Sequence, residues 1–170
     1  MGTGELLFEQ LNQLRSSRTI ILGIGNSLKG DDGVGPFVCQ QLKHSKISAE
    51  IIDAGTVPEN YIQVIVKKAP NNLLIIDAID FGAEAGAIEI FKPERLNSFA
   101  ISTHTLSPHL FVDMLSQQIK VEVYFIGIQP AQTHLGQSVS GQVKQAAQQL
   151  SRILTDIFPP TRKTPPKRRG

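Results

Sequence analysis

The chain contains Thr19-Ile20-Ile21-Leu22-Gly23-Ile24-Gly25-Asn26-Ser27-Leu28-Lys29-Gly30-Asp31-Asp32-Gly33-Val34-Gly35-Pro36, an apolar run that leads into a glycine-rich turn. The run predicts a buried strand, and Pro36, which a helix tolerates only in its first turn, predicts that a helix begins near Gly35. In α/β proteins, such a turn often holds a phosphate on backbone N–H groups. Here the phosphate-loop and dinucleotide-binding patterns are both incomplete, and two carboxylates, Asp31 and Asp32, occupy the turn. The turn therefore predicts a site for a metal ion or a cationic group.

Strand and helix patterns alternate from this turn onward. Near-continuous apolar runs predict parallel strands at 19–25, 49–53, 73–77 and 121–128, and an alternating run predicts a shorter edge strand at 87–91. Helices are expected after the turn, from Pro58, from Ser107-Pro108 and over 139–157, with Asp31 and Asp32 left in the loop before the first of them. The third of these helices is expected to turn four side chains inward: Leu110, Phe111, Met114 and Leu115. The pattern predicts a single three-layer α/β/α domain with a mostly parallel, twisted sheet of about five strands.

The two ends of the chain differ from this core. We divide the chain into an N-terminal helical extension (1–18), a main domain (19–158) and a disordered basic tail (159–170). Five of the 17 lysines and arginines lie in the last nine residues, and the other 12 face 15 acidic residues, a net charge of −3. No aromatic residues interleave with the basic ones, so we expect no nucleic-acid partner.

Apolar runs and cysteine content bear on location. No apolar run approaches 18 residues and no charged-then-apolar leader is present, so we expect neither membrane insertion nor a signal peptide. The single cysteine, Cys39, excludes an internal disulfide and is compatible with the reducing cytoplasm, where we expect the protein to be located. Its place in the predicted first helix of the core favours a packing role over a nucleophilic one.

Polar side chains follow several predicted strands, at the sheet edge where ligands bind in this class of fold. They are Asn26, Asp31, Asp32, Asp53, Asp77, Asp80 and Gln129, with His104 in a later loop. Carboxylate and imidazole donors together suit nickel or zinc better than calcium or magnesium. Asp53 and Asp80 also suit turn or cap roles, whereas Asp77, directly after an apolar run, favours a site role. Between the paired carboxylates we assign the site role to Asp32, with Asp31 holding the loop.

Three histidines compete for a place in that site: His104, His109 and His134. A fourth, His44, follows the first core helix in a polar stretch and is expected to be exposed. From the residues alone the choice among the three stays open.

Five motifs in order resemble the hydrogenase maturation proteases, endopeptidases that trim the C-terminus of nickel–iron hydrogenase large subunits. The motifs are Gly23-x-Gly25-Asn26-x-Leu28-x-x-Asp31-Asp32-Gly33-x-Gly35, Asp53-Ala54-Gly55-Thr56-x-Pro58-Glu59, Ile75-Ile76-Asp77-Ala78, Ser102-Thr103-His104 and Gly127-Ile128-Gln129-Pro130. The resemblance covers roughly residues 19–157, and five motifs in register are specific where one alone is weak.

The resemblance implies a nickel-recognising site and a protein partner. Asp32, Asp77 and His104 would be the catalytic and metal-recognising residues, with Asn26, Asp31, Asp53, Gln129 and His109 in a second tier or contacting substrate. His109 competes with His104, because some relatives place the histidine in a Ser-Pro-His context. The partner would be the large-subunit precursor, which brings the nickel with it, and other divalent cations can substitute.

The mechanism and the class of function each have alternatives. The metal would act as a specificity key and as a Lewis acid, or a carboxylate would act as general base on water. An aspartic-protease dyad of Asp32 and Asp77 is a third mechanism, which leaves His104 without a role. Two other functions remain, a metal-dependent small-molecule hydrolase and a non-catalytic chaperone that binds nickel or the precursor.

Overall fold

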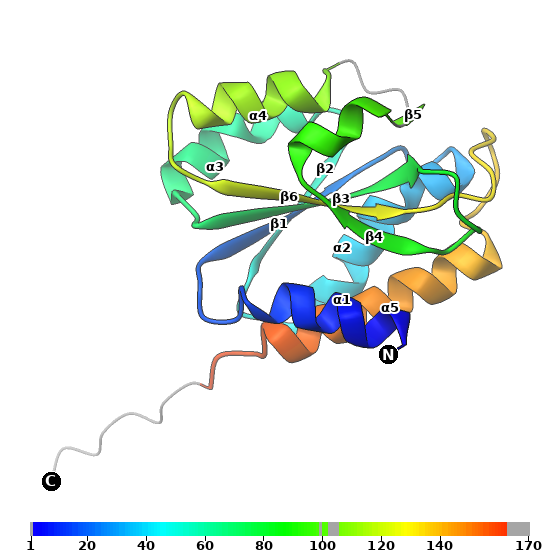
Figure 1. The fold of residues 1–170 in the computed structure, drawn as a ribbon, viewed down its shortest axis with the longest axis horizontal. Coiled ribbons are helices and arrows are strands. Elements are labelled where there is room, and N and C mark those ends of the chain that lie inside the picture. Colours follow the sequence, from blue (N-terminus) through cyan, green and yellow to red (C-terminus); the bar gives the residue numbers. More distant parts are fainter. Residues whose placement is uncertain (1, 99, 102–105, 163–170) are drawn as a thin grey trace, which may run out of the picture.

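The computed structural model describes residues 2–98, 100–101 and 106–162 (Figure 1). In chain order its elements are α1 (Thr3–Asn12), β1 (Thr19–Ile24), η1 (Gly30–Gly33), α2 (Val34–Ser45), β2 (Glu50–Gly55), η2 (Pro58–Tyr61), α3 (Ile62–Lys68), β3 (Asn72–Asp80), β4 (Ile88–Phe91), η3 (Pro93–Ser98), β5 (Ala100–Ile101), α4 (Pro108–Ser116), β6 (Glu122–Ile128) and α5 (Gly141–Ile157). The η elements are short 3₁₀ helices. Among the described residues, no helix combines the length and the apolar character that crossing a bilayer requires.

A mostly parallel sheet forms the middle layer. Its strand order is β2-β1-β3-β6-β4; β1, β2, β3 and β6 run parallel, and β4 pairs antiparallel with β6 at one edge. The two residues of β5 pair antiparallel with the end of β3. Strand β3 lies in the centre and is buried over eight consecutive residues, because helices cover both of its faces.

Two hydrophobic clusters hold the three layers together. One lies under α1, α2 and α5 and includes Val34, Val38 and Leu42 of α2, which share one buried face. The other lies under α3, α4 and η3 on the opposite face of the sheet. Figure 1 shows these two groups of helices on either side of the strands. Helix α1 packs on α5, and its Leu7 and Leu11 belong to the first cluster.

The predicted architecture is confirmed, with three local differences. The carboxylates of the turn lie in η1 rather than in an open loop, because the chain begins to coil one turn before α2. A 3₁₀ turn occupies Pro58–Tyr61, so the second core helix starts only at Ile62. Strand β5 was not predicted, since two residues carry no usable hydrophobic period.

Helix α4 buries a narrower face than expected. Its start is as predicted, with the Ser107 hydroxyl accepting a hydrogen bond from the backbone N–H of Leu110 at 3.2 Å. Phe111 and Leu115 are buried, but Leu110 and Met114 are largely exposed. The prediction that these two face inward is wrong, because α4 is a surface helix that packs along one stripe only.

The start of α2 approaches the sheet closely at Gly35. A Cβ at this position would lie 2.6 Å from the carbonyl oxygen of Ile76 and would also overlap the backbone of Ile24. Only glycine fits between these two strands. The contact brings the start of α2 against β3, one residue before Asp77.

Cys39 is fully buried in α2, and burial raises the pKa of its thiol from 9.0 to about 12. Only the thiolate reacts with disulfide reagents. At pH 8 we therefore expect the folded protein to react with an aromatic disulfide about a thousandfold more slowly than the urea-unfolded chain, since three pKa units separate the two thiols. The reaction is followed by the absorbance of the released aromatic thiolate, and equal rates for the folded and unfolded protein would contradict a buried thiol.

The raised pKa of Cys39 also affects stability. Below pH 9 the thiol is protonated in both states, so its contribution to the free energy of unfolding is intact, and that contribution is lost as the pH rises toward 12.

Candidate active site

Asp32 lies in η1, at the carboxyl edge of the sheet, and is only 4% exposed. Its Oδ2 accepts a hydrogen bond of 3.0 Å from the backbone N–H of Asn26. This bond closes the turn on itself. Gly25 makes the closure sterically feasible, since its φ of 149° suits glycine and a Cβ would collide with the carbonyl oxygen of Asp32. The turn therefore holds the Asp32 carboxylate in a fixed position.

Asp31 has a different role, although it is adjacent in sequence. Its carboxylate is completely buried and accepts four hydrogen bonds. The donors are the backbone N–H groups of Ala131 (2.8 Å), Gln132 (3.1 Å) and Ser140 (2.6 Å), and the Ser140 hydroxyl (2.9 Å). Asp31 thus ties the loop between β6 and α5 to the opening turn, the loop-holding role expected for it.

Asp77 lies in β3 and is 3% exposed. It pairs in register with Gly127 of β6, and it follows Ile76, whose carbonyl oxygen lies against Gly35. Element η1 contacts β3 directly. The fold therefore brings Asp32, in the turn after β1, and Asp77, in the neighbouring strand β3, to the same edge of the sheet as two buried carboxylates.

The histidines are placed unequally. His104 lies outside the described residues, so its predicted position is neither supported nor opposed. His109 is the second residue of α4 and is half-buried, and within the described part of the chain its Nε2 is buried with no hydrogen-bond partner. His134 and His44 are exposed, the latter as expected.

Gln129 and Asp80 together brace the loop after β3. The buried side-chain amide of Gln129 donates from Nε2 to Oδ1 of Asp80 at 3.0 Å. Its Oε1 accepts from the backbone N–H groups of Phe81 (2.9 Å) and Ala83 (3.2 Å). The hydrogen bond from Gln129, with a second from the Gly82 N–H, lowers the pKa of Asp80 below its ordinary value. Both polar groups of the Gln129 side chain therefore support the loop after β3, at the carboxyl edge of the sheet.

Asn26 and Asp53 have local partners of their own. The Asn26 Oδ1 accepts from the Leu28 N–H at 2.9 Å, which shapes the same turn that holds Asp32. Asp53, at the end of β2, is exposed and accepts a bond of 3.1 Å from the Gly55 N–H.

For two residues near this edge of the sheet, Ser140 and Glu59, the sequence alone predicts no role. Ser140 supplies half of the hydrogen bonds to Asp31, and its place one residue before α5 is the available signal, since serine is a common helix N-cap. Glu59 is half-buried in η2, and its Oε2 is buried with no hydrogen-bond partner in the described chain. The Pro58-Glu59 pair of the second motif is the signal that marks it.

Carboxylate oxygens are the donors that this edge of the sheet offers to a cation. Asp32 and Asp77 offer carboxylate oxygens, and a histidine would complete a set that favours borderline metals. Among the described residues, which leave out His104, no group of three or more His, Cys, Asp or Glu side chains could hold a metal ion. The two carboxylates can also activate or orient a water molecule.

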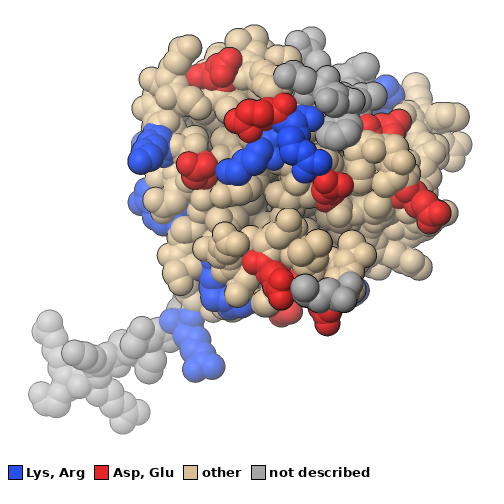
Figure 2. All heavy atoms as spheres, in the orientation of Figure 1, with Lys and Arg blue, Asp and Glu red and all other residues tan. Residues whose placement is uncertain are grey.

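Surface charges on the face drawn in Figure 2 are mixed in sign. Lys92 pairs with Glu122 at 3.2 Å and Arg95 with Glu89 at 3.0 Å. Among the described residues on this face, basic side chains are interspersed with acidic ones.

Comparisons with known proteins agree on one family. The family model described as hydrogenase maturation protease matches residues 38–157. A Methanocaldococcus jannaschii protein named for the same family is 31% identical over 163 residues, covering 91% of this chain and 95% of the relative. The hydrogenase 3 maturation protease of Escherichia coli K12 is 39% identical over 113 residues, or 65% and 72% of the two chains. The crystal structure of a nickel–iron hydrogenase maturation protease from Thermococcus kodakarensis superposes with a TM-score of 0.79 at 31% identity, covering 87% of this chain and 97% of that one.

Proposed function

Since this chain belongs to the hydrogenase maturation protease family, and is a hydrolase of the peptidase class, we propose that it removes a C-terminal peptide from the nickel-loaded large-subunit precursor of a nickel–iron hydrogenase. The observation that carries the proposal is the placement of Asp32 and Asp77 as two buried carboxylates at one edge of the sheet. Charged side chains are seldom buried, so a pair of them at the edge where α/β folds bind ligands supports a role in a functional site. In this proposal nickel is part of the substrate, because it arrives with the precursor, and the reaction takes place in the cytoplasm.

The proposed reaction is the hydrolysis of one peptide bond. Water adds to the scissile carbonyl carbon, the C–N bond breaks, and the released amine takes up a proton. In this proposal Asp32, which accepts from the Asn26 N–H, and Asp77, in the central strand, recognise the cation and take a proton from the attacking water. His104 is the third group of the proposed set. The nickel acts as a specificity key, since a precursor without it lacks the group that these side chains recognise.

The choice of histidine is tested with two single variants, His104→Ala and His109→Ala. Each is incubated with purified nickel-loaded precursor, and release of the C-terminal peptide is followed by intact mass. We expect His104→Ala to lower the cleavage rate by at least about a hundredfold, because it removes a group that acts on the reaction, and His109→Ala to stay within about threefold of wild type.

The reverse pattern would transfer the site role to His109, whose Nε2 is already buried without a partner in the described chain. Full activity in both variants would remove His104 and His109 from the mechanism and favour an aspartic dyad of Asp32 and Asp77. Absence of any cleavage by the wild-type enzyme would contradict the proposed function itself.

A further inference from the structure

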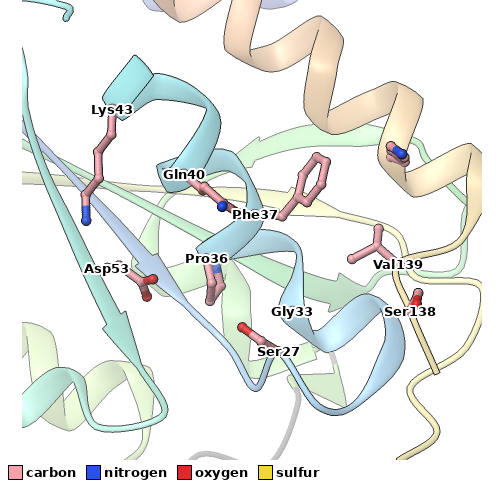
Figure 3. A pocket seen from close by; sticks show the side chains of 10 residues that line it. Ser27, Gly33, Pro36, Phe37, Gln40, Lys43, Asp53, Ser138 and Val139 are labelled. Carbon is pink, nitrogen blue, oxygen red and sulfur yellow. The ribbon is translucent and has the colours of Figure 1, made fainter. Parts of the chain in front are cut away.

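An open trough crosses the outer face of α2, beside the turn that carries Asp32 (Figure 3). Its volume is about 550 Å³, within the range of ligand-binding sites. Pro36 and Phe37 of α2 form an apolar centre; Asp53 and Lys43 lie on one side of them, with Val139 on the other.

The trough begins at the opening turn. Ser27 and Gly33 belong to its lining. Ser27 follows Asn26 and Gly33 follows Asp32, so both flank the hydrogen bond that fixes the Asp32 carboxylate. Asp32 and Asp77 themselves do not line it. An extended chain lying in the trough would thus run beside the turn that holds Asp32, at the carboxyl edge of the sheet.

The charges around the trough are unbalanced. Lys43 and Lys144 are exposed in its lining, and within the described part of the molecule neither forms an ion pair. Asp53 is the single acidic residue among the lining residues, so the lining carries a net charge of +1. The trough therefore combines an apolar centre with an excess of positive charge.

Exposed apolar side chains lie near the opening turn, where the trough begins. They favour a protein partner over a small ligand. Leu28 is 69% exposed and Leu135 is 74% exposed. The two loops that carry them are joined, because the Gly136 N–H donates to the Leu28 carbonyl oxygen at 2.8 Å. Two strongly exposed leucines on loops that a hydrogen bond joins favour contact of this surface with another protein.

We propose that this trough binds the segment of the precursor that is cut off, as an extended peptide. Its apolar side chains lie on Pro36, Phe37 and Val139, and its C-terminal carboxylate lies at Lys144, on the same side of the trough as Val139. This assignment rests on the proposed function, since a C-terminal extension is the one substrate segment that ends in a free carboxylate. It adds to that function a binding site away from Asp32 and Asp77. This site selects a peptide by its C-terminal carboxylate.

The test measures binding of a short peptide to the full chain. The probe is a fluorescein-labelled hexapeptide of alternating leucine and alanine with a free C-terminal carboxylate, compared with the same peptide amidated. By fluorescence anisotropy we expect the carboxylate form to bind about fivefold more tightly, the size typical of exposed charge pairs. The double variant Lys43→Ala, Lys144→Ala should lower this ratio to about one.

A matched double variant, Lys67→Ala with Lys120→Ala, removes two exposed lysines outside the trough and should keep the fivefold ratio. In the processing assay the trough variant should raise KM for the precursor about fivefold and leave kcat unchanged. Equal affinity of the wild type for both peptides, or an unchanged ratio in the trough variant, overturns the proposal.

These outcomes are separable from failure of the proposed function. Peptide binding requires neither nickel nor cleavage, so a wild type that cleaves precursor but ignores the terminal carboxylate rejects only the trough. A wild type that prefers the carboxylate peptide but cleaves no precursor rejects only the protease.

Discussion

Asp77→Asn is expected to lower the rate of precursor cleavage by about a thousandfold or more. The substitution keeps the size of the side chain but removes its negative charge, so it can neither recognise a cation as strongly nor accept a proton from water. Asp32→Asn should have a similar effect. The rate is measured in single-turnover reactions with nickel-loaded precursor, by intact mass at timed intervals.

Asp156→Asn is the matched control. Asp156 is an exposed carboxylate in the last turn of α5, at the end of that helix remote from the loop that Asp31 holds, and its loss should leave the rate within about twofold. Circular dichroism establishes that each variant is folded. Wild-type rates in a folded Asp77→Asn would exclude this carboxylate from the chemistry.

Asp31→Ala is expected to destabilise the fold by about 4 kcal/mol, although Asp31 neighbours Asp32. The substitution leaves four donors without their acceptor, three backbone N–H groups and the Ser140 hydroxyl, and unpaired buried donors cost about 1–3 kcal/mol each before relaxation and water entry. Urea unfolding followed by circular dichroism gives the change in the free energy of unfolding.

Asp53→Ala serves as the comparison, because Asp53 is exposed and accepts one local hydrogen bond, and it should cost at most about 1 kcal/mol. Equal stability of the two variants would mean that the loop between β6 and α5 does not depend on Asp31. Asp31 would then have no structural role that distinguishes it from Asp32.

Much of the fold was predictable, because local periodicity and burial agree. Strand β3 is buried on both faces and appears in the sequence as a continuous apolar run, and Val34, Val38 and Leu42 repeat at the helical period on the face that α2 buries. The exposure of Leu110 and Met114 was not predictable, since it depends on how α4 sits on the sheet.

The site was predictable only in part. The sequence predicts Asp32 after one strand and Asp77 at the end of another, and therefore both at a common edge, although β3 continues to Asp80. It cannot show what each one contacts. The partners of Asp31 lie about a hundred residues along the chain, and the separation of roles between Asp31 and Asp32 becomes visible only in the fold. The trough across α2 is likewise assembled from segments that carry no common motif.

The central proposal is cleavage of a precursor that already carries nickel. The most direct measurement incubates the wild-type protein with nickel-loaded and with nickel-free precursor and records the intact mass of the large subunit in each. We predict loss of a C-terminal peptide from the nickel-loaded form alone. Equal cleavage of the two forms would contradict nickel recognition by Asp32 and Asp77, and cleavage of neither would contradict the proposed peptidase activity.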